Sequence, residues 1–299
     1  MAVRACLFLV GCVGCISLTS ALPNEIPTVP GPSGVSEAPK TPHVLQYPRC
    51  QYAHVDAIDD KDFIIKQLTA SPTFTKPFDS ATYFCGLFPP TLFREIIENF
   101  PPDKAFENYA SKIKKCDLGG CRYSLSAFNI LRQKKIPNWP GFQPAKKLYQ
   151  KLVDIVFSSE FEKALWEKLK ITKKSTRREF RILSDKHGFS NGRIHTDIQA
   201  RKIATMMFYL PVTNASAFDY GTCLHTTDQW KNRRILKKGG VKREDTGLDG
   251  EGDCFYKFRF LPNTGYSFKV SHSSWHSAPN TVINHFDEHD RNTILLNWY

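Results

Sequence analysis

The chain has 299 residues, enough for one large domain or for one domain with a helical extension. Its apolar content of 41% and aromatic content of 13% exclude a chain that is disordered throughout. The 41 Lys and Arg residues outnumber the 29 Asp and Glu residues, giving a net charge of +12. The basic residues form short runs without aromatic residues between them, so we do not expect nucleic acid as a partner.

The first 21 residues have the pattern of a signal peptide. Arg4 supplies a positive charge near the start, residues 5–18 form a short apolar stretch, and small residues stand at 19–21, where a signal peptidase would cut. Residues 9–12 also fit a bacterial lipoprotein box, and we favour the signal peptide. No later stretch reaches the ~18 apolar residues of a membrane span. We therefore expect a secreted chain, or one in the ER or Golgi lumen, with no transmembrane segment after signal removal.

A linker and a mainly helical region are expected next. Residues 22–48 are rich in Pro, Gly, Ser and Thr and lack apolar periodicity, which indicates an extended linker. Residues 49–176 are expected to be mainly helical and to pack on the domain that follows. Early in this region the sequence predicts a short strand, a Pro-Pro turn and then a helix over 91–98, which Pro101 ends.

Two longer helices are predicted before the strands begin. The first covers 144–157 and opens with a proline, as first turns often do. The second covers 159–171 and begins at Ser159, with Glu162 in the position of a capping box. Both carry apolar residues at helical spacing on one side, which is typical of helices that pack against another layer.

After residue 177 the pattern changes to short strands separated by turns. The predicted strands cover residues 179–183, 203–211, 254–261, 266–270 and 293–299. A helical first half followed by such strands predicts an α+β fold, in which helices pack on a β-sandwich or barrel. We expect the barrel domain at 177–299.

Six cysteines remain after the signal peptide, an even number in a chain directed to an oxidising compartment. They are Cys50, Cys85, Cys116, Cys121, Cys223 and Cys254. Disulfides are therefore expected, although six cysteines allow many pairings. Cys116 and Cys121 could close a local loop, and Cys223 and Cys254 could join the two ends of a long basic segment.

This basic segment, near 228–252, is longer than an ordinary connection between strands. Two interpretations stay open: a lid or loop that faces the substrate, or a solvated, partly disordered insertion. Asn214 begins the one glycosylation sequon of the chain, which fits a lumenal route.

Two histidines and one aspartate indicate the chemistry. His195 and Asp197 are two residues apart, so on an extended segment both side chains point to one face. With His276 as a third ligand, two imidazoles and one carboxylate could hold an iron ion on one side and leave its other positions open. We predict these three as metal ligands and catalytic residues. Five other histidines are expected to be ordinary surface or hydrogen-bonded residues: His187, His225, His272, His285 and His289.

The order of the neighbouring parts strengthens this prediction, since a His-x-Asp pair alone is a weak signal. The apolar strand at 203–211 follows the pair, and Arg291 and Thr293 open the last strand beyond the third ligand. A dicarboxylate needs a cation to bind its distal carboxylate, and an arginine with a nearby hydroxyl suits that geometry.

A series of motifs stands in a fixed order over about 180–299. They are His195-Thr196-Asp197, Lys202, Tyr209-Leu210-Pro211, Pro262-Asn263-Thr264, Phe268, Ser274-Trp275-His276-Ser277, Arg291-Asn292-Thr293 and Tyr299. In these motifs the chain resembles the Fe(II)/2-oxoglutarate-dependent dioxygenase superfamily. The resemblance implies a double-stranded β-helix (jelly-roll) core and the use of Fe(II), 2-oxoglutarate and O2. It also implies that Arg291, assisted by Thr293, binds the far carboxylate of 2-oxoglutarate, and that Tyr209 donates to the same co-substrate.

The implied activity is hydroxylation of a substrate, with conversion of 2-oxoglutarate to succinate and CO2. The substrate could be a protein or peptide, a glycan or a small molecule, and the expected compartment favours a protein or peptide. Two other classes stay open: a jelly-roll binding protein without turnover, and a cupin-type metalloenzyme that does not use 2-oxoglutarate. The complete ligand set argues against the first, and Arg291 with Thr293 argues against the second.

Overall fold

The structure is a computed structural model that describes residues 56–77, 79–106, 122–133, 139–186, 194–211, 221–226, 254–278 and 290–299. The expected signal peptide, the linker, the basic segment near 228–252 and the sequon at Asn214 lie outside these residues. The same holds for the local loop that Cys116 and Cys121 could close. Among the residues that are described, no helix is long and apolar enough to cross a membrane.

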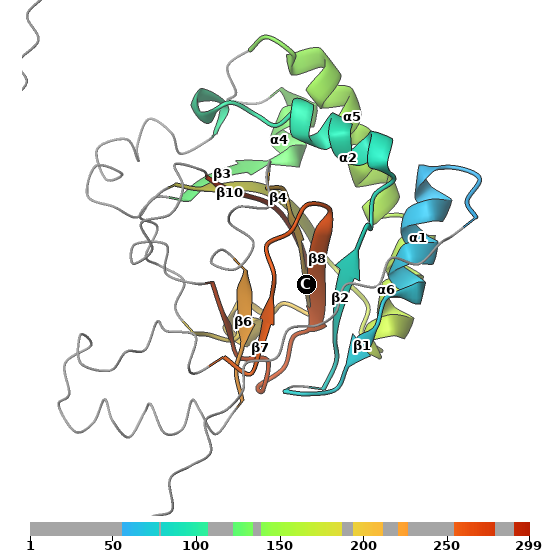
Figure 1. Cartoon of the computed structure of the whole chain (residues 1–299), viewed down its shortest axis with the longest axis vertical. Coiled ribbons are helices and arrows are strands. Elements are labelled where there is room, and N and C mark those ends of the chain that lie inside the picture. The colour runs from blue at the N-terminus through green and yellow to red at the C-terminus, as the bar shows by residue number, and fades with distance from the viewer. Residues whose placement is uncertain are drawn as a thin grey trace, which may run out of the picture. The chain divides into compact units, whose positions relative to one another are not determined.

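Most of the regular helical structure lies before residue 170, where the sequence predicts it (Figure 1). The α-helices of the described chain are α1 (Asp60–Ala70), α2 (Pro90–Glu98), α4 (Ala127–Arg132), α5 (Phe142–Val156) and α6 (Ser159–Leu169). The three predicted helices correspond to α2, α5 and α6, whereas α1 and α4 were not predicted.

Side-chain caps fix where two of these helices begin. Asp59 caps α1 by accepting a hydrogen bond of 2.8 Å from the backbone N–H of Asp62. Ser158 caps α6 by accepting a hydrogen bond of 3.1 Å from the backbone N–H of Phe161. The predicted cap at Ser159 is therefore wrong by one residue, because the preceding serine takes that place.

The strands form two antiparallel sheets. They are β1 (Thr73–Phe74), β2 (Ala81–Cys85), β3 (Arg122–Ser126), β4 (Arg178–Asp185), β5 (Ala204–Tyr209), β6 (Thr222–Leu224), β7 (Tyr256–Phe258), β8 (Thr264–Lys269), β9 (His276–Ser277) and β10 (Arg291–Trp298). The larger sheet has the order β1-β2-β8-β5-β10-β4-β3, and the smaller has the order β7-β6-β9. Helices with two antiparallel sheets confirm the predicted α+β jelly-roll fold.

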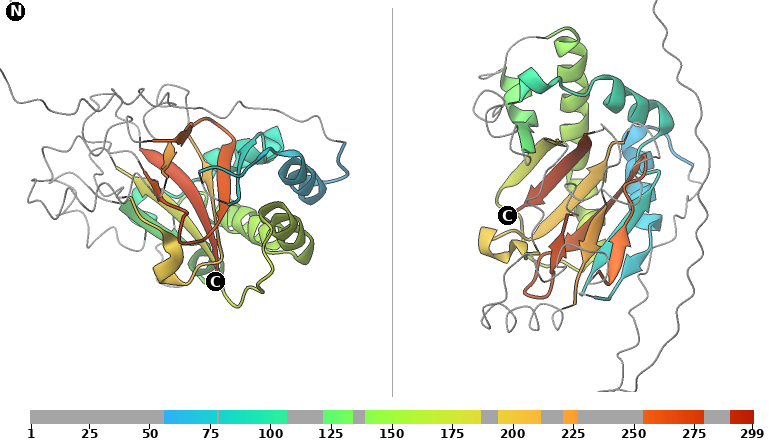
Figure 2. Two further views of the ribbon diagram at one scale, coloured as in Figure 1. Left: turned by 90° about the horizontal axis from the view of Figure 1, so that it is seen from below. Right: turned by 60° about the vertical axis from the view of Figure 1, so that its left-hand side comes forward.

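The larger sheet has two faces of different composition, because side chains alternate along a strand. We call the face toward the helices the outer face and the opposite one the inner face (Figures 1 and 2). Outer-face side chains such as Phe208 and Trp298 share one core with the buried sides of the helices. Inner-face side chains such as Tyr83 and Tyr266 share a second core with Phe258 of the smaller sheet. The inner face therefore borders the space between the two sheets.

A disulfide joins Cys223 in β6 to Cys254, just before β7, with Cα atoms 5.3 Å apart. This pairing was one of those considered from the sequence, and it is confirmed. Cys85 is also disulfide-bonded. The Cys223–Cys254 bond links β6 to the start of β7 in the smaller sheet, which carries the predicted metal ligand His276 on β9.

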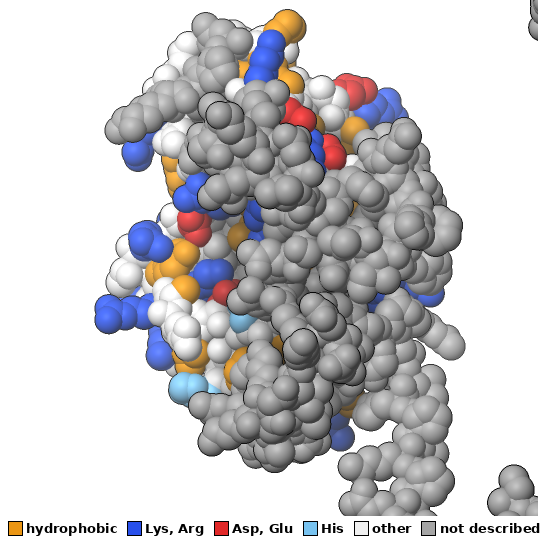
Figure 3. Space-filling view, turned by 90° about the vertical axis from the view of Figure 1, so that its left-hand side faces the viewer, with side chains coloured by type: hydrophobic (Ala, Val, Ile, Leu, Met, Phe, Trp, Pro, Cys, Tyr) orange, Lys and Arg blue, Asp and Glu red, His pale blue; other side chains and the backbone are white. Residues whose placement is uncertain are grey.

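Charged side chains of both signs are spread over the described part of the face seen in Figure 3. Exposed ion pairs also occur elsewhere on the described residues, such as Lys61 of α1 with Glu160 of α6 at 3.0 Å. Exposed pairs of this kind contribute about 0–1 kcal/mol each. The two apolar cores therefore hold the fold together, and surface charge adds little.

Candidate metal centre

The structure brings the three predicted ligands together. One potential ligand atom from each of His195, Asp197 and His276 lies within 4.8 Å of the other two. His195 Nε2 is 3.8 Å from Asp197 Oδ1, and His276 Nε2 is 4.0 Å from Asp197 Oδ2. Bonds of about 2.0–2.2 Å at right angles, as on one face of an octahedral ion, place two donors about 3 Å apart. The three side chains therefore point at a common position, and they would have to move closer together to share one ion.

Backbone pairing explains how residues far apart in the sequence meet. His195 and His276 form an isolated antiparallel bridge, in which each backbone N–H donates to the other carbonyl at 3.0 Å. Thr196 is extended, with φ −113° and ψ 152°, and Asp197 then opens the 3-10 helix η2 (Asp197–Ala200). The extended segment predicted for the His-x-Asp pair is therefore short, but it is long enough to place both side chains on one side.

The carboxylate of Asp197 is oriented by two neighbours. Thr205 Oγ1 donates to Asp197 Oδ2 at 2.8 Å, and Lys202 Nζ donates to Asp197 Oδ1 at 3.0 Å. Burial by itself raises the pKa of this carboxyl group, but the charges of His276 and Lys202 and the two hydrogen bonds lower the pKa more. Asp197 is therefore ionised at neutral pH, as a metal ligand must be.

The imidazole of His276 is also held in a defined orientation. Its Nδ1 donates to the carbonyl oxygen of Ser274 at 3.0 Å, which leaves the lone pair of Nε2 on the side of Asp197. Burial, together with the charge of His195, lowers the pKa of His276 to about 4. The ring is therefore neutral at pH 7, which is the form that binds metals.

A cavity with a volume of about 110 Å³ opens beside these side chains. Its lining comprises Arg122, His195, Asp197, Lys202, Thr205, Met207, Thr222, Tyr266, His276, Ala278, Arg291 and Leu295. One water molecule occupies about 30 Å³ in the liquid. The cavity is therefore of a size for a small organic molecule, and its walls combine the three predicted metal ligands with cationic side chains.

Arg291 lies in this cavity, as expected from the sequence, and is 2% exposed. Its Nη1 donates to Asp185 Oδ2 at 2.9 Å, and its Nη2 lies 3.5 Å from Met207 Sδ. Thr293, on the same face of β10, is fully buried, and its Oγ1 has no hydrogen-bond partner among the described residues. A hydroxyl in such a position has capacity left for a ligand.

The predicted Tyr209 is also near, but it does not line the cavity. Burial raises the pKa of Tyr209 well above its usual value, and its hydroxyl donates to Thr222 Oγ1 at 2.8 Å. The tyrosine that lines the cavity is Tyr266, on the neighbouring strand β8. Tyr209 is therefore separated from the cavity by one hydrogen bond, to the lining residue Thr222.

Several cavity residues were missed by the sequence reasoning. Thr205 and Arg122 received no role, and Lys202 was noted only as part of a motif. Arg122 begins β3, a strand that was not predicted, although its polar and apolar residues alternate in burial. That alternation is the signal that could have placed the Arg122 side chain on the inner face.

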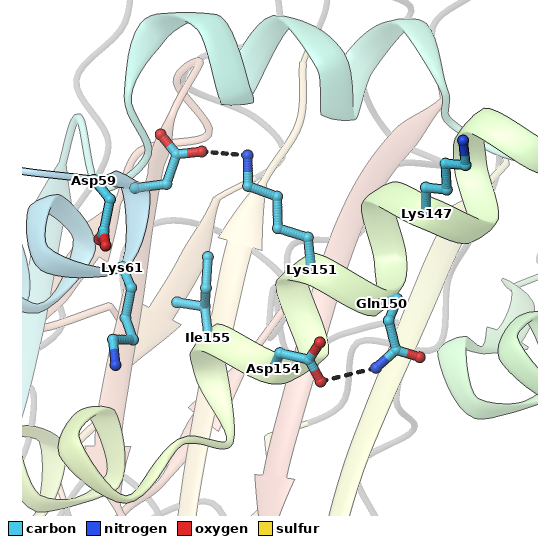
Figure 4. Close-up of a pocket in the computed structure, with 8 residues that line it drawn as sticks. Asp59, Lys61, Lys147, Gln150, Lys151, Asp154 and Ile155 are labelled. Carbon is cyan, nitrogen blue, oxygen red and sulfur yellow. Dashed lines mark hydrogen bonds and ion pairs between the residues drawn. The ribbon is translucent and has the colours of Figure 1, made fainter.

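A second hollow, of about 650 Å³, lies between the start of α1 and α5 (Figure 4). Two pairs of its polar side chains are bonded to each other: Lys151 forms an ion pair with Asp60, and Gln150 Nε2 donates to Asp154 Oδ1 at 2.8 Å (Figure 4). None of the predicted site residues lines it. The chemistry indicated by the sequence therefore lies in the smaller cavity.

No family model and no curated protein matches the chain. Solved structures do match it, and prolyl hydroxylases and a 2OG-Fe(II) oxygenase are among them. A prolyl-4-hydroxylase of Pseudomonas putida is 11% identical with a TM-score of 0.37, covering 79% of this chain and 96% of that one. A prolyl 4-hydroxylase of Phytophthora capsici is 9% identical with a TM-score of 0.45, and the match covers 83% of this chain and 68% of that one. A 2OG-Fe(II) oxygenase of Burkholderia pseudomallei is 8% identical with a TM-score of 0.35, and the match covers 85% of this chain and 94% of that one.

Proposed function

We propose that the chain is an iron(II)- and 2-oxoglutarate-dependent oxygenase that hydroxylates its substrate. One observation carries the proposal: two imidazoles and one carboxylate converge at a cavity whose wall also holds a buried arginine. Two His and one carboxylate on one side of an ion, with open positions opposite, are the ligand set of non-haem iron(II) oxygenases. A buried guanidinium in the same cavity suits the second carboxylate of a dicarboxylic acid.

The donor set fits the metal in its protonation states as well as in its geometry. Asp197 is ionised and His276 is neutral, so neither needs to lose a proton to bind a cation near pH 7. When bound, iron(II) would supply O2 activation coupled to decarboxylation of 2-oxoglutarate. The chain would contribute the ligands, the orientation of the co-substrate and an enclosed cavity.

Each side chain then has a defined task. His195, Asp197 and His276 would hold the metal, and Thr205 would keep the carboxylate in place. Arg291 would donate charge-assisted hydrogen bonds to the distal carboxylate of 2-oxoglutarate. Thr293 and Tyr209 are proposed for the same end of the cavity, Tyr209 through its hydrogen bond to Thr222.

The distance between the two ends of the cavity supports this arrangement. Thr205 contacts Asp197, and Met207 contacts Arg291. Thr205 and Met207 are two residues apart on one face of β5, which corresponds to roughly 7 Å along the strand. A short-chain diacid could therefore reach from the metal ligands to the guanidinium group.

A metalloenzyme of the cupin type, which would not use 2-oxoglutarate, is the second candidate. One observation favours it: Arg291 already donates to a carboxylate, that of Asp185, at 2.9 Å. An arginine occupied in this way could be structural. Binding of 2-oxoglutarate that depends on the metal separates the two candidates, because a cupin-type enzyme has no dicarboxylate to bind.

We also propose a lumenal or secreted location and a protein or peptide substrate. The disulfide between Cys223 and Cys254 supports an oxidising compartment, since disulfides are rare in reducing ones. The signal peptide expected at residues 1–21 agrees with that compartment. Glycans and secreted small molecules are the other substrate pools to be tested.

The test is an assay of succinate formation from 2-oxoglutarate with Fe(II) and O2. Protein, glycan and small-molecule pools are supplied, and mass spectrometry detects a gain of one oxygen atom. We expect turnover with one pool and its loss in His195→Ala. His272→Ala, at an exposed position that does not line the cavity, is the matched control. If a folded His195→Ala protein keeps full turnover, His195 is not part of the site. If the wild type consumes no 2-oxoglutarate with any pool, the proposal is contradicted.

A further inference from the structure

A row of three charged side chains crosses the inner face of the larger sheet. Arg122 of β3 pairs in register with Asp185 of β4, and Asp185 pairs in register with Arg291 of β10. Residues directly opposite one another in adjacent strands have their side chains on the same face. We call these three residues the charged row. Only Arg291 has a role in the function proposed above.

The two arginines share one carboxylate. Arg122 Nε donates to Asp185 Oδ1 at 2.5 Å and Arg122 Nη2 to Asp185 Oδ2 at 2.9 Å, which is a bidentate pair. Arg291 Nη1 donates to Asp185 Oδ2 at 2.9 Å. Burial raises the pKa of Asp185, but the charges of and hydrogen bonds from the two arginines lower the pKa more. Asp185 is therefore ionised, and the charged row carries two positive charges and one negative charge.

The three residues of the charged row differ in how they lie relative to the cavity. Arg122 and Arg291 both line the cavity, whereas Asp185 is fully buried and does not. The Arg122 side chain is 34% exposed, compared with 2% for Arg291. Asp185 is thus placed behind two guanidinium groups that both border the cavity. Guanidinium groups held in this way are suited to a carboxylate ligand, because each has more N–H donors than the carboxylate of Asp185 uses.

We propose that Arg122 binds the distal carboxylate of the 2-oxo diacid together with Arg291, and that Asp185 positions both guanidinium groups. This inference rests on the proposed function and adds a second cation to its co-substrate site. Arg122 would then be a specificity residue. It would favour a 2-oxo diacid over a 2-oxo monocarboxylate, because the latter brings no second carboxylate to the charged row.

The experiment is calorimetric titration of the full chain loaded with Mn(II), which replaces iron without redox chemistry. 2-Oxoglutarate is titrated into the wild type, Arg122→Ala and Arg122→Lys, with exposed Arg132→Ala as the matched control. Removal of a hydrogen bond to a charged group corresponds to about a 10- to 100-fold weaker Kd. We expect this loss in Arg122→Ala and a smaller one in Arg122→Lys, which keeps the charge but not the planar fork. Arg132→Ala should bind as the wild type does.

Two further readouts separate a binding role from a structural one. Mn(II) affinity without co-substrate should be unchanged in the Arg122 variants, and 2-oxobutyrate, a monocarboxylate, should bind wild type and Arg122→Lys equally. If Arg122→Ala binds 2-oxoglutarate as tightly as the wild type does, the role of Arg122 is overturned and the proposed function stands. The same holds if Arg122→Ala loses as much affinity for 2-oxobutyrate as for 2-oxoglutarate. Failure of the wild type to bind 2-oxoglutarate in the presence of Mn(II) would instead overturn the proposed function and this inference with it.

Discussion

The two faces of the larger sheet use the same strands for different purposes. On β10 the side chains of Ile294, Leu296 and Trp298 join the outer core, while Arg291 borders the cavity. On β5 Phe208 points outward, and Thr205 contacts a predicted metal ligand. The period of two in a strand thus separates residues that stabilise the fold from residues that form the site.

The difference between the faces predicts how substitutions should act. The outer face is apolar and continuous with the helices, so its residues should affect the free energy of unfolding most. The inner face near the cavity carries hydroxyl groups and charges, so its residues should affect ligand binding most.

The largest effect is expected on the outer face. Phe208 is 2% exposed and packs against Phe84 and Phe88, with a ring distance to Phe88 of 4.9 Å. Phe208→Ala should lower the free energy of unfolding by about 3–5 kcal/mol, because it removes buried surface and leaves a cavity. Urea unfolding followed by circular dichroism measures the change. A loss below about 1 kcal/mol would contradict the assignment of this face to the core.

The next effect is expected at the far end of the cavity. Arg291→Ala should weaken 2-oxoglutarate binding by about 2–5 kcal/mol, since it removes a charged partner from a buried site. Its Mn(II) affinity should stay near that of the wild type. Arg94→Ala on α2 is an exposed control. Unchanged 2-oxoglutarate affinity, measured by calorimetry, would place the binding of the distal carboxylate elsewhere.

A pH dependence is expected from His276. Its pKa is about 4 in the folded chain and about 6.5 when unfolded, so only the unfolded state takes up this proton between those values. The metal-free protein should therefore lose stability as pH falls from about 6.5 to about 4, by on the order of 3 kcal/mol. Urea midpoints at a series of pH values measure this loss. His276→Asn should show a smaller decrease, and an equal decrease in both proteins would assign it to other groups.

The smallest of these effects is expected from Thr205. Thr205→Val keeps the shape of the side chain but removes the hydrogen bond to Asp197 Oδ2. We expect Mn(II) affinity to fall about 10- to 100-fold, as is usual when the partner of a metal ligand is lost. Thr82→Val, a buried threonine on β2 that donates to a backbone carbonyl, is the matched control. Equal Mn(II) affinities in the two variants would show that Thr205 does not orient the carboxylate.

Part of this arrangement was predictable from the sequence. β5 and β10 were expected because they are long and apolar, and the fold class followed from helices before strands. The meeting of His195 with Asp197 followed from their spacing. The motif context then indicated His276 as the third member of the group.

Other parts depend on contacts that no local pattern records. α1 buries only Ile64, Gln67 and Leu68, which is too sparse a stripe to predict a helix. The charged row was missed because Arg122 and Asp185, taken singly, resemble surface residues. Only the register of β3, β4 and β10 brings them beside Arg291.

The central claim is that three side chains hold one metal ion and that 2-oxoglutarate binds only when the ion is present. The most direct measurement is calorimetric titration of Mn(II), and then of 2-oxoglutarate, into the metal-free wild type and Asp197→Ala. We predict one Mn(II) per wild-type chain, 2-oxoglutarate binding only after Mn(II), and loss of both in Asp197→Ala. Binding of 2-oxoglutarate without metal, or full Mn(II) affinity in Asp197→Ala, would contradict the claim.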